Sequence, residues 1–529
     1  MPAAALTDVH RLLLLFGGAA TVTLVARAFG ARKKRNPSNL PLPPGPKPLP
    51  VVGNLKDIPQ HDPWVGYNAL TQQYGDMVYL NVLGQGVLIV GSQTRAVDLL
   101  VKRAVKWSSR PAPAMLELMD FEWSFGVMGY GQLWRDNRRT FHHFFTPSVL
   151  AQWHPIVSEE RDVLFKALRE NPKPNPQELF DHVHLLFGRA IMRIAYGFED
   201  APTNAALIHD AEVVLDGFGE SSVPGKFLVN SFPILKHVPA WMPGAGFQTY
   251  MKDLAIKSRN ICTPPLKLAK ANLEKGLNRK YPSMAATLVD KMAQEEYATE
   301  AERTRDEGIA EGVCASAYIA GSDTTVTGGI ILLAALANNP DVQRRGQEEV
   351  DSVVSLDRLP VVEDRDSMPY VHAIVKEVQR WYTTVPLGTP HVNDEDDEYD
   401  GFFIPKDTFV FTNAWAIMHS EELFERPWEF LPDRYIGKDG RINKSVPDPE
   451  IGAFGYGRRI CPGRHFSNDA LFLYAASLLA VFNITPPKDE AGNTVPIKVE
   501  PNFVGNTANV KPHKFACEFS IRSRGNLVH

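Results

Sequence analysis

The residues best suited to chemistry lie in one short stretch near the C-terminus. The segment from Phe454 to Phe466 places a single cysteine, Cys461, among glycines and arginines, and an apolar, helix-like run from Phe466 to Phe482 follows it. Glycines let the backbone approach another group closely, and arginines supply fixed positive charge. Because the dipole of a helix N-terminus favours a thiolate, we expect Cys461 to be a thiolate ligand presented to a metal.

The alternative for Cys461 alone is a small buried residue beside a turn, which is what a lone cysteine usually is. The residues around Cys461 favour its assignment as a metal ligand. Five positions of an F-x-x-G-x-R-x-C-x-G pattern are present, at Phe454, Gly457, Arg459, Cys461 and Gly463. The pattern resembles the haem-binding loop of the cytochrome P-450 superfamily. That resemblance implies that Cys461 is the axial ligand of haem b and that Phe454, Arg459 and Gly463 contact the cofactor.

A tryptophan and an arginine, Trp134 and Arg138, are four residues apart and share one face of a predicted helix. The alternative is an interfacial aromatic beside a surface arginine, since such pairs are common. The pair also matches the W-x-x-x-R of the resembling family, which implies that both side chains donate to a haem propionate. By the same resemblance Arg459 and His391 supply further propionate contacts, and buried carboxylates require such partners.

A long helical pattern from Asp306 to Asn339 is weak at its middle, where the sequence reads Ala-Gly-Ser-Asp-Thr-Thr from 320 to 325. Mid-helix hydroxyls usually bond back to the preceding turn. The segment also resembles the A-G-x-D-T-T oxygen-activation segment of the family. That resemblance implies that Gly321 opens the helix for dioxygen, that Thr324 hydrogen-bonds beside it, and that Asp323 relays protons from solvent.

A glutamate and an arginine, Glu377 and Arg380, match the E-x-x-R of the family, and the segment from 430 to 435 resembles its F-x-P-E-R-F, with Asp433 and Tyr435 as variations. An isolated pair at this spacing is usually solvated and contributes about 0.3 kcal/mol. The resemblance implies instead that Glu377, Arg380 and Arg434 form a buried network behind the haem loop, with a structural role.

Composition excludes several other classes of protein. The 529 residues are 44% hydrophobic and 22% charged, and 56 basic against 61 acidic residues give a net charge of −5, which does not suggest a nucleic-acid binder. The 4 cysteines are far apart and form no C-x-x-C, which excludes a disulfide scaffold, a zinc ribbon and a cysteine-ligated iron–sulfur cluster.

We predict a mainly α fold with small β-sheets. A helix over Trp64–Tyr74 precedes two strands, Met77–Val82 and Val87–Val90, which form a hairpin through Gly84-Gln85-Gly86. Helical patterns dominate afterwards. The resemblance covers nearly the whole chain and implies the cytochrome P-450 fold, with a single large haem domain over residues 54–529.

The N-terminus predicts a membrane anchor over residues 1–35. Leu12 to Ala26 is uncharged and mostly apolar, and the basic run Arg32–Arg35 places the remaining chain on the cytoplasmic side. Residues 36–53 are proline-rich and predict a stiff hinge. A cleaved signal peptide is the alternative. The anchor implies a single-pass protein of the endoplasmic reticulum membrane.

The resemblance also implies partners. Apolar loops at 115–130 and 218–251 would line and cover a pocket for an apolar small molecule. No G-x-G-x-x-G follows a strand, so the chain shows no nicotinamide or flavin domain of its own. Electrons would come from NADPH through a separate cytochrome P-450 reductase, with cytochrome b5 as a second candidate donor. Lys102, Arg458 and Arg464 are candidates for docking the reductase.

The function that these motifs predict is a haem-thiolate monooxygenase, which inserts one oxygen atom from dioxygen into an apolar small molecule. The segments at 386–391 and 413–419 and the haem loop resemble fungal members related to O-methylsterigmatocystin oxidoreductase, which implies terpenoid or polyketide tailoring in secondary metabolism. Two alternatives stay open, a haem-thiolate peroxygenase or isomerase that needs no reductase, and a haem-thiolate sensor or carrier without catalysis.

Overall fold

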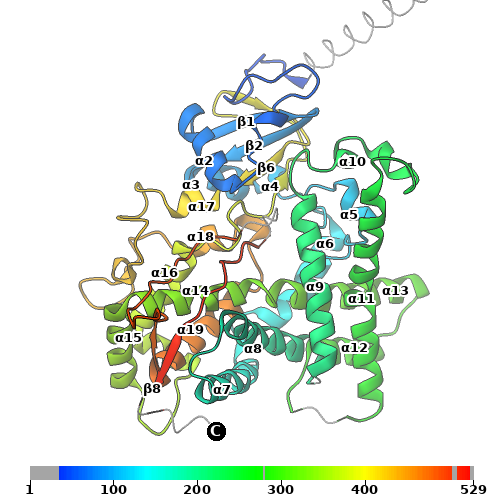
Figure 1. Cartoon of the computed structure of the whole chain (residues 1–529). Coiled ribbons are helices and arrows are strands. Elements are labelled where there is room, and N and C mark those ends of the chain that lie inside the picture. The colour runs from blue at the N-terminus through cyan, green and yellow to red at the C-terminus, as the bar shows by residue number, and fades with distance from the viewer. Residues whose placement is uncertain (1–34, 200, 278–279, 503–508, 523, 525–529) are drawn as a thin grey trace, which may run out of the picture.

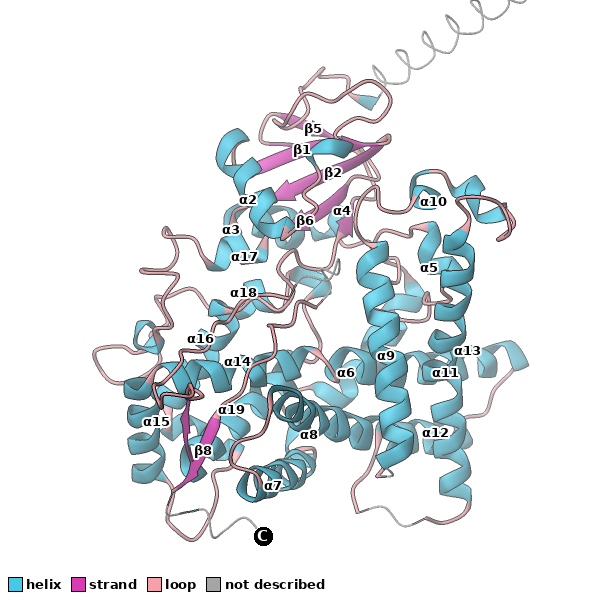
Figure 2. Cartoon of the chain, viewed as in Figure 1, coloured by secondary structure: helices cyan, strands magenta, loops and turns pink. Residues whose placement is uncertain are grey.

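Helices dominate the molecule, and the strands gather in one small sheet at one end and a two-stranded pair near the opposite end (Figure 2). The computed structural model describes residues 35–199, 201–277, 280–502, 509–522 and 524. The predicted mainly α fold with small sheets is confirmed over these residues. The predicted anchor at 1–35 lies outside them except for Arg35.

The helices form the body of the molecule below the sheet (Figure 1). The longer helices are α2 (Pro63–Tyr74), α6 (Gln132–Phe145), α7 (His154–Glu170), α8 (Pro176–Tyr196), α9 (Ala201–Ser221), α11 (Gly246–Glu274), α12 (Met284–Gln294), α13 (Glu300–Gly321), α14 (Thr324–Asn338), α15 (Pro340–Val353), α16 (Pro369–Trp381) and α19 (Arg464–Val481). Short helices are α3 (Gln93–Val97), α4 (Ala104–Trp107), α5 (Ala114–Leu118), α10 (Leu228–Ser231), α17 (Ala414–Met418) and α18 (Glu450–Ala453).

The larger sheet has the strand order β1-β2-β6-β3. Its strands are β1 (Met77–Val82), β2 (Gln85–Val90), β3 (His391–Val392) and β6 (Phe409–Thr412), and the smaller pairs are β4 (Asp397–Tyr399) with β5 (Phe402–Ile404) and β7 (Phe482–Thr485) with β8 (Glu518–Ile521). β2 pairs with β6 in parallel, and β6 pairs with β3 antiparallel. The sheet therefore holds His391, in β3, beside residues far away in the chain.

The predicted hairpin is present with a tighter turn than expected. Leu83 and Gly84 both have positive φ, at 53° and 91°, and Gln85 already pairs with Val82. The second strand thus begins two residues before the predicted Val87. A two-residue turn with both residues left-handed matches the twist of the strands, which explains the earlier start.

The proline-rich segment lies against the sheet. The Tyr79 N–H donates to the Pro44 carbonyl at 2.8 Å, and the Phe403 N–H donates to the Pro41 carbonyl at 2.8 Å. A Cβ at Gly45 would lie 2.2 Å from the Tyr79 carbonyl oxygen, so only glycine permits this approach. The stiff segment is therefore bound to the domain that follows it.

The stretch 300–338 is the core of the molecule. Within the described residues it is the one helical stretch long and apolar enough to cross a membrane, and 78% of its apolar window is buried inside the protein. Its hydropathy is thus explained by packing against other helices. The predicted single helix is divided at the predicted weak point, because α13 ends at Gly321 and α14 begins at Thr324.

A buried ion network joins α16 to the segment before the haem loop. Glu377 and Arg380 are fully buried, and the Arg380 Nε and Nη2 donate to the two Glu377 carboxylate oxygens at 2.8 and 2.7 Å. Arg434 donates to Glu377 at 3.1 Å, and the Leu431 N–H donates to it at 2.8 Å. Asp433 lies outside this network and pairs with Arg345.

We expect Glu377→Ala to lower the free energy of unfolding by about 3–5 kcal/mol, because it leaves two buried guanidinium groups without their carboxylate. Denaturant titration of the purified protein measures the loss. Arg344→Ala, which breaks the exposed pair with Glu348 at 2.8 Å, is the matched control and should leave the midpoint unchanged. Equal midpoints for both variants would contradict a stabilising role for the network.

Candidate active site

Cys461 lies in a tightly bonded loop just before α19. Its N–H donates to the Phe454 carbonyl at 2.8 Å, which closes the loop, and the Arg464 guanidinium donates to the Cys461 carbonyl at 3.3 Å. Gly457 has φ +55°, and a Cβ there would lie 2.1 Å from the Leu100 carbonyl oxygen. This glycine is thus required by close packing against residues 100–101.

The protein alone does not hold Cys461 as a thiolate. Burial raises the pKa of its thiol above the ordinary value, and this outweighs the lowering by the backbone N–H groups of Gly463 and Arg464 and by the Arg138 guanidinium. The N-terminus of α19 therefore lowers the pKa of Cys461 less than burial raises it, contrary to the expectation from the sequence. A coordinated metal ion deprotonates a thiol outright and would supply the remaining stabilisation.

Arg459 and Trp134 stack beside the cysteine loop. The Arg459 guanidinium lies 4.2 Å from the centre of the Trp134 ring and donates to the carbonyls of Ser108 and Met128, each at 2.7 Å. Arg138, one turn after Trp134 on α6, donates to the Ile460 carbonyl at 2.5 Å. The predicted W-x-x-x-R pair therefore lies directly against the loop that carries Cys461.

His391 and a second arginine complete this group. The His391 Nδ1 lies 2.8 Å from the Trp107 carbonyl, and the imidazole is buried. Arg110, which the sequence analysis did not single out, donates to the carbonyls of Thr389 at 2.6 Å and Pro390 at 2.8 Å. Nothing in its local sequence, Ser-Ser-Arg-Pro, marks it, because two of its carbonyl partners are about 280 residues away.

The cluster is positively charged and short of acidic partners. Burial together with repulsion from neighbouring arginines lowers the pKa of Arg459 to about 8 and that of Arg110 to about 9. Burial also lowers the pKa of Arg138, and burial and Arg110 lower that of His391. In the described part of the chain no salt bridge joins a carboxylate to any of the three arginines.

Such a cluster requires an anion. A guanidinium keeps its proton in proteins, so the cost of burying these charges is offset when carboxylates lie between them. The two propionates of a haem would satisfy these donors, and Cys461 beside them would ligate its iron. The residues present thus fit the cofactor.

The break between α13 and α14 lies near the first turn of α19. The Thr325 hydroxyl is 3.2 Å from the Ser467 hydroxyl, three residues into that helix. Ala320 is exposed, although residues 313–319 before it on α13 are buried. The Thr324 hydroxyl donates to the Ala320 carbonyl at 2.9 Å, across the break.

The predicted acid, Asp323, is buried at the break and held by the C-terminal segment. Its Oδ1 lies 2.6 Å from the Lys511 ammonium, and the Asn509 side-chain amide donates to its Oδ2. The two residues that hold the acid, Asn509 and Lys511, carry no motif in the sequence.

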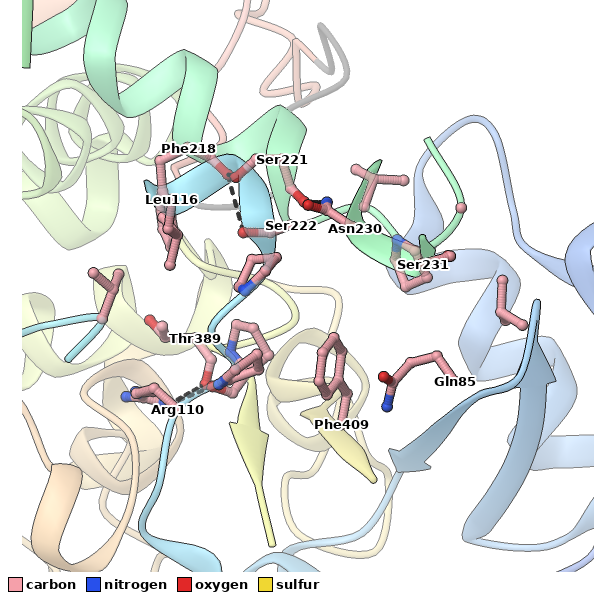
Figure 3. Close-up of a pocket in the computed structure, with 18 residues that line it drawn as sticks. Gln85, Arg110, Leu116, Phe218, Ser221, Ser222, Asn230, Ser231, Thr389 and Phe409 are labelled. Atoms are coloured by element: carbon pink, nitrogen blue, oxygen red, sulfur yellow. Dashed lines mark hydrogen bonds between the residues drawn. The ribbon is translucent and has the colours of Figure 1, made fainter. Parts of the chain in front are cut away.

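A pocket adjoins the arginine cluster on the side toward the sheet (Figure 3). It lies between the C-terminal end of α9, the segment 110–127 and strands β2 and β6, and Arg110 and Thr389 form part of its wall. Leu116, Val127 and Phe218 contribute apolar groups. The predicted apolar loops at 115–130 and 218–251 thus both reach this pocket.

The comparisons with known proteins decide the family. A family model described as cytochrome P450 matches residues 43–511. The chain belongs to the cytochrome P450 family. Cytochrome P450 monooxygenase COX1 of Coprinopsis cinerea is 46% identical over 521 residues, which are 98% of each chain. COX2 of the same organism is 39% identical over 482 residues, which cover 91% of this chain and 89% of that relative.

A third relative carries a more specific name. Tryptamine 4-monooxygenase of Psilocybe cyanescens is 35% identical over 491 residues, which cover 91% of this chain and 93% of that relative. These matches run across almost the whole chain. This cytochrome P450 is therefore a haem-thiolate monooxygenase that acts on a small molecule and receives its electrons from a partner reductase.

We expect Arg138→Ala to weaken haem retention about 10- to 100-fold, because one charge-assisted hydrogen bond is worth about 1.5–3 kcal/mol. The ratio of haem to protein after dilution and gel filtration measures the loss. Arg135→Ala removes an exposed arginine one turn earlier on the same helix and should retain haem like the unaltered protein. Equal retention in both variants would contradict the role of Arg138 in the cluster.

Proposed function

We propose that this cytochrome P450 oxygenates a neutral, mainly apolar small molecule of the terpenoid or polyketide kind in fungal secondary metabolism. The observation that supports this proposal is the chemical composition of the pocket wall. Arg110 is the one charged group among the described residues that line it, and the remainder are apolar groups with a few neutral polar ones. An apolar wall with few convergent polar groups selects an apolar ligand that carries few polar groups.

The named substrate of one relative, tryptamine, makes a useful contrast. A protonated amine needs a carboxylate or an aromatic cage when it is taken out of water. The described lining holds no carboxylate, and its side chains include Ser221, Ser222 and Asn230 as neutral hydrogen-bonding groups (Figure 3). These groups suit the hydroxyl or carbonyl oxygens of a neutral substrate better than an ammonium group.

In this proposal the chain's own residues bind and orient the cofactor. Cys461 ligates the iron, while Trp134, Arg138, Arg459, His391 and Arg110 hold the propionates. Phe454 and Gly463 shape the loop around the ligand. When bound, the haem supplies the activation of dioxygen for insertion of one oxygen atom into a C–H bond.

At the break between α13 and α14, Asp323 and Thr324 would move protons. The Thr324 hydroxyl would accept and donate hydrogen bonds beside the exposed Ala320, and Asp323 would pass protons toward it from solvent. An enzyme that does not split dioxygen has no need of this pair, which favours the monooxygenase over an isomerase or a sensor.

We further propose that the protein is a single-pass protein of the endoplasmic reticulum membrane, with an anchor at 1–35, a hinge at 36–53 and the catalytic domain at 54–529 on the cytoplasmic side. Exposed apolar side chains support membrane contact, among them Val51 at 93%, Ile234 at 74% and Trp241 at 82% exposure. The α10 region and the first described residues lie toward the same end of the molecule (Figure 1).

The reductase is proposed to dock on the cysteine side, at Arg458, Arg464 and Lys102, with cytochrome b5 as a second donor. Lys102 is 70% exposed and pairs with Asp98, and Arg458 donates to the Tyr130 hydroxyl at 2.8 Å. These groups present positive charge over the loop that carries Cys461, where an acidic partner would approach the cofactor.

The proposal predicts product only with NADPH, reductase and dioxygen, and only from neutral substrates. A panel of neutral sesquiterpenes and aromatic polyketides is compared with tryptamine, and mass spectrometry follows the incorporation of one 18O atom from labelled dioxygen. Equal turnover with hydrogen peroxide alone would favour the peroxygenase alternative. Faster oxidation of tryptamine than of every neutral compound would contradict the substrate class.

A further inference from the structure

Asp323 is not free to carry protons in this structure. Both of its carboxylate oxygens are engaged from the C-terminal segment, one by the Lys511 ammonium at 2.6 Å and the other by the Asn509 side-chain amide. The Asn509 side-chain carbonyl in turn accepts from the Thr327 hydroxyl at 3.4 Å. The Asp323 side chain is 6% exposed. Any movement of it toward Thr324 therefore requires the ion pair with Lys511 and the hydrogen bond from Asn509 to break.

Lys511 has a second carboxylate within reach. Its ammonium lies 3.1 Å from the Glu212 carboxylate on α9, and His184 on α8 lies 3.8 Å from the same carboxylate oxygen. Burial alone would lower the pKa of Lys511, but Asp323 and Glu212 raise it well above the ordinary value. The lysine thus stays charged and is shared by two acids from different elements.

The same side chains could be mistaken for a metal site. The ligand atoms of His184, Glu212 and Asp323 lie within 4.8 Å of one another. The Lys511 ammonium, however, already lies against both carboxylates and supplies the positive charge that a cation would bring. The cluster is therefore better explained as an ion-pair bridge than as a metal centre.

The bridge joins the acid to an element that covers the pocket. Glu212 lies six residues before Phe218 on α9, about 9 Å along the helix, and Phe218 and Ser221 line the pocket (Figure 3). A molecule in the pocket would contact Phe218 and Ser221, at the C-terminal end of α9. A shift of that end of α9 would alter the distance between Glu212 and Lys511.

We propose that Lys511 is a positioning residue that couples occupancy of the pocket to Asp323. With α9 as in this structure, Lys511 and Asn509 hold Asp323 away from Thr324. When α9 moves inward, Lys511 transfers to Glu212 and frees Asp323 to turn. The lysine keeps a carboxylate partner throughout the exchange.

This inference rests on the proposed role of Asp323, and two variants with opposite effects test it. Haem-loaded protein is mixed with reductase and NADPH without added substrate, and hydrogen peroxide release is measured in water and in deuterium oxide. Lys511→Met should raise this release about tenfold, at the low end of what positioned proton transfer contributes, because Asp323 is then held by Asn509 alone and turns more readily. Glu212→Gln should lower it, because Lys511 then stays on Asp323.

Two control variants distinguish positioning of Asp323 by Lys511 from a general effect on packing around α9. Lys511→Arg keeps both ion pairs and should behave like the unaltered protein. Lys257→Met breaks another ion pair of α9, with Asp210 at 2.6 Å, and should leave peroxide release unchanged. If Lys511→Met and Glu212→Gln move the release in the same direction, or if Lys257→Met matches Lys511→Met, the inference is wrong.

A readout independent of turnover completes the test. Hydrogen–deuterium exchange, followed by mass spectrometry, should speed up in residues 509–522 and in α9 for Lys511→Met. For Lys257→Met it should speed up in α9 and α11 but not in residues 509–522. Unchanged exchange in 509–522 for Lys511→Met would show that the bridge does not hold the segment. A protein that fails to oxidise NADPH at all contradicts the proposed function, while the exchange result still decides whether the bridge exists.

Discussion

Three guanidinium groups lie close together inside this protein, and within the described residues no carboxylate forms a salt bridge with any of them. Arg110, Arg138 and Arg459 come from distant parts of the chain. Each is oriented by backbone carbonyls that accept hydrogen bonds from its guanidinium group. Burying guanidinium groups without a carboxylate costs free energy, and a bound anion offsets that cost. The fold around the cysteine loop is organised to bring these groups and Cys461 to one place.

The buried network around Glu377 differs from the arginine cluster in how its charges are paired. Glu377 is buried between Arg380 and Arg434, and the remaining donors of Arg380 meet the carbonyls of Met418 and Pro427. Every charge there has a partner within the chain. The arginine cluster beside Cys461 is built from the same residue type but forms no salt bridge within the described residues, and haem propionates would supply the counter-charge.

Much of the site could be predicted from the sequence because its residues lie in short motifs. Cys461, Trp134 with Arg138, and Asp323 with Thr324 each have neighbours at fixed spacing, so local pattern carried the prediction. The long helices were likewise predictable, since their apolar faces repeat every three or four residues over many turns. The fold class followed from these helices and one recognisable hairpin.

The parts that escaped prediction depend on contacts across the chain. Arg110 acts through carbonyls about 280 residues away, and Lys511 reaches Asp323 from the C-terminal segment. The pKa of Cys461 depends on how deeply the fold buries it, which no motif encodes. The proline-rich segment looks like a free spacer until its hydrogen bonds to the sheet are known. Roles assigned to individual site residues, and the membrane anchor, stay predictions.

The reduced, carbon monoxide-bound absorption spectrum tests the central claim most directly, because the position of the Soret band reports the ligand opposite carbon monoxide. The unaltered protein should show the far-red band of thiolate ligation. Cys461→Ser, checked by circular dichroism for an intact fold, should lose that band. A far-red band that survives in Cys461→Ser, or that is absent from the unaltered haem-loaded protein, would contradict the assignment of Cys461 as the axial ligand.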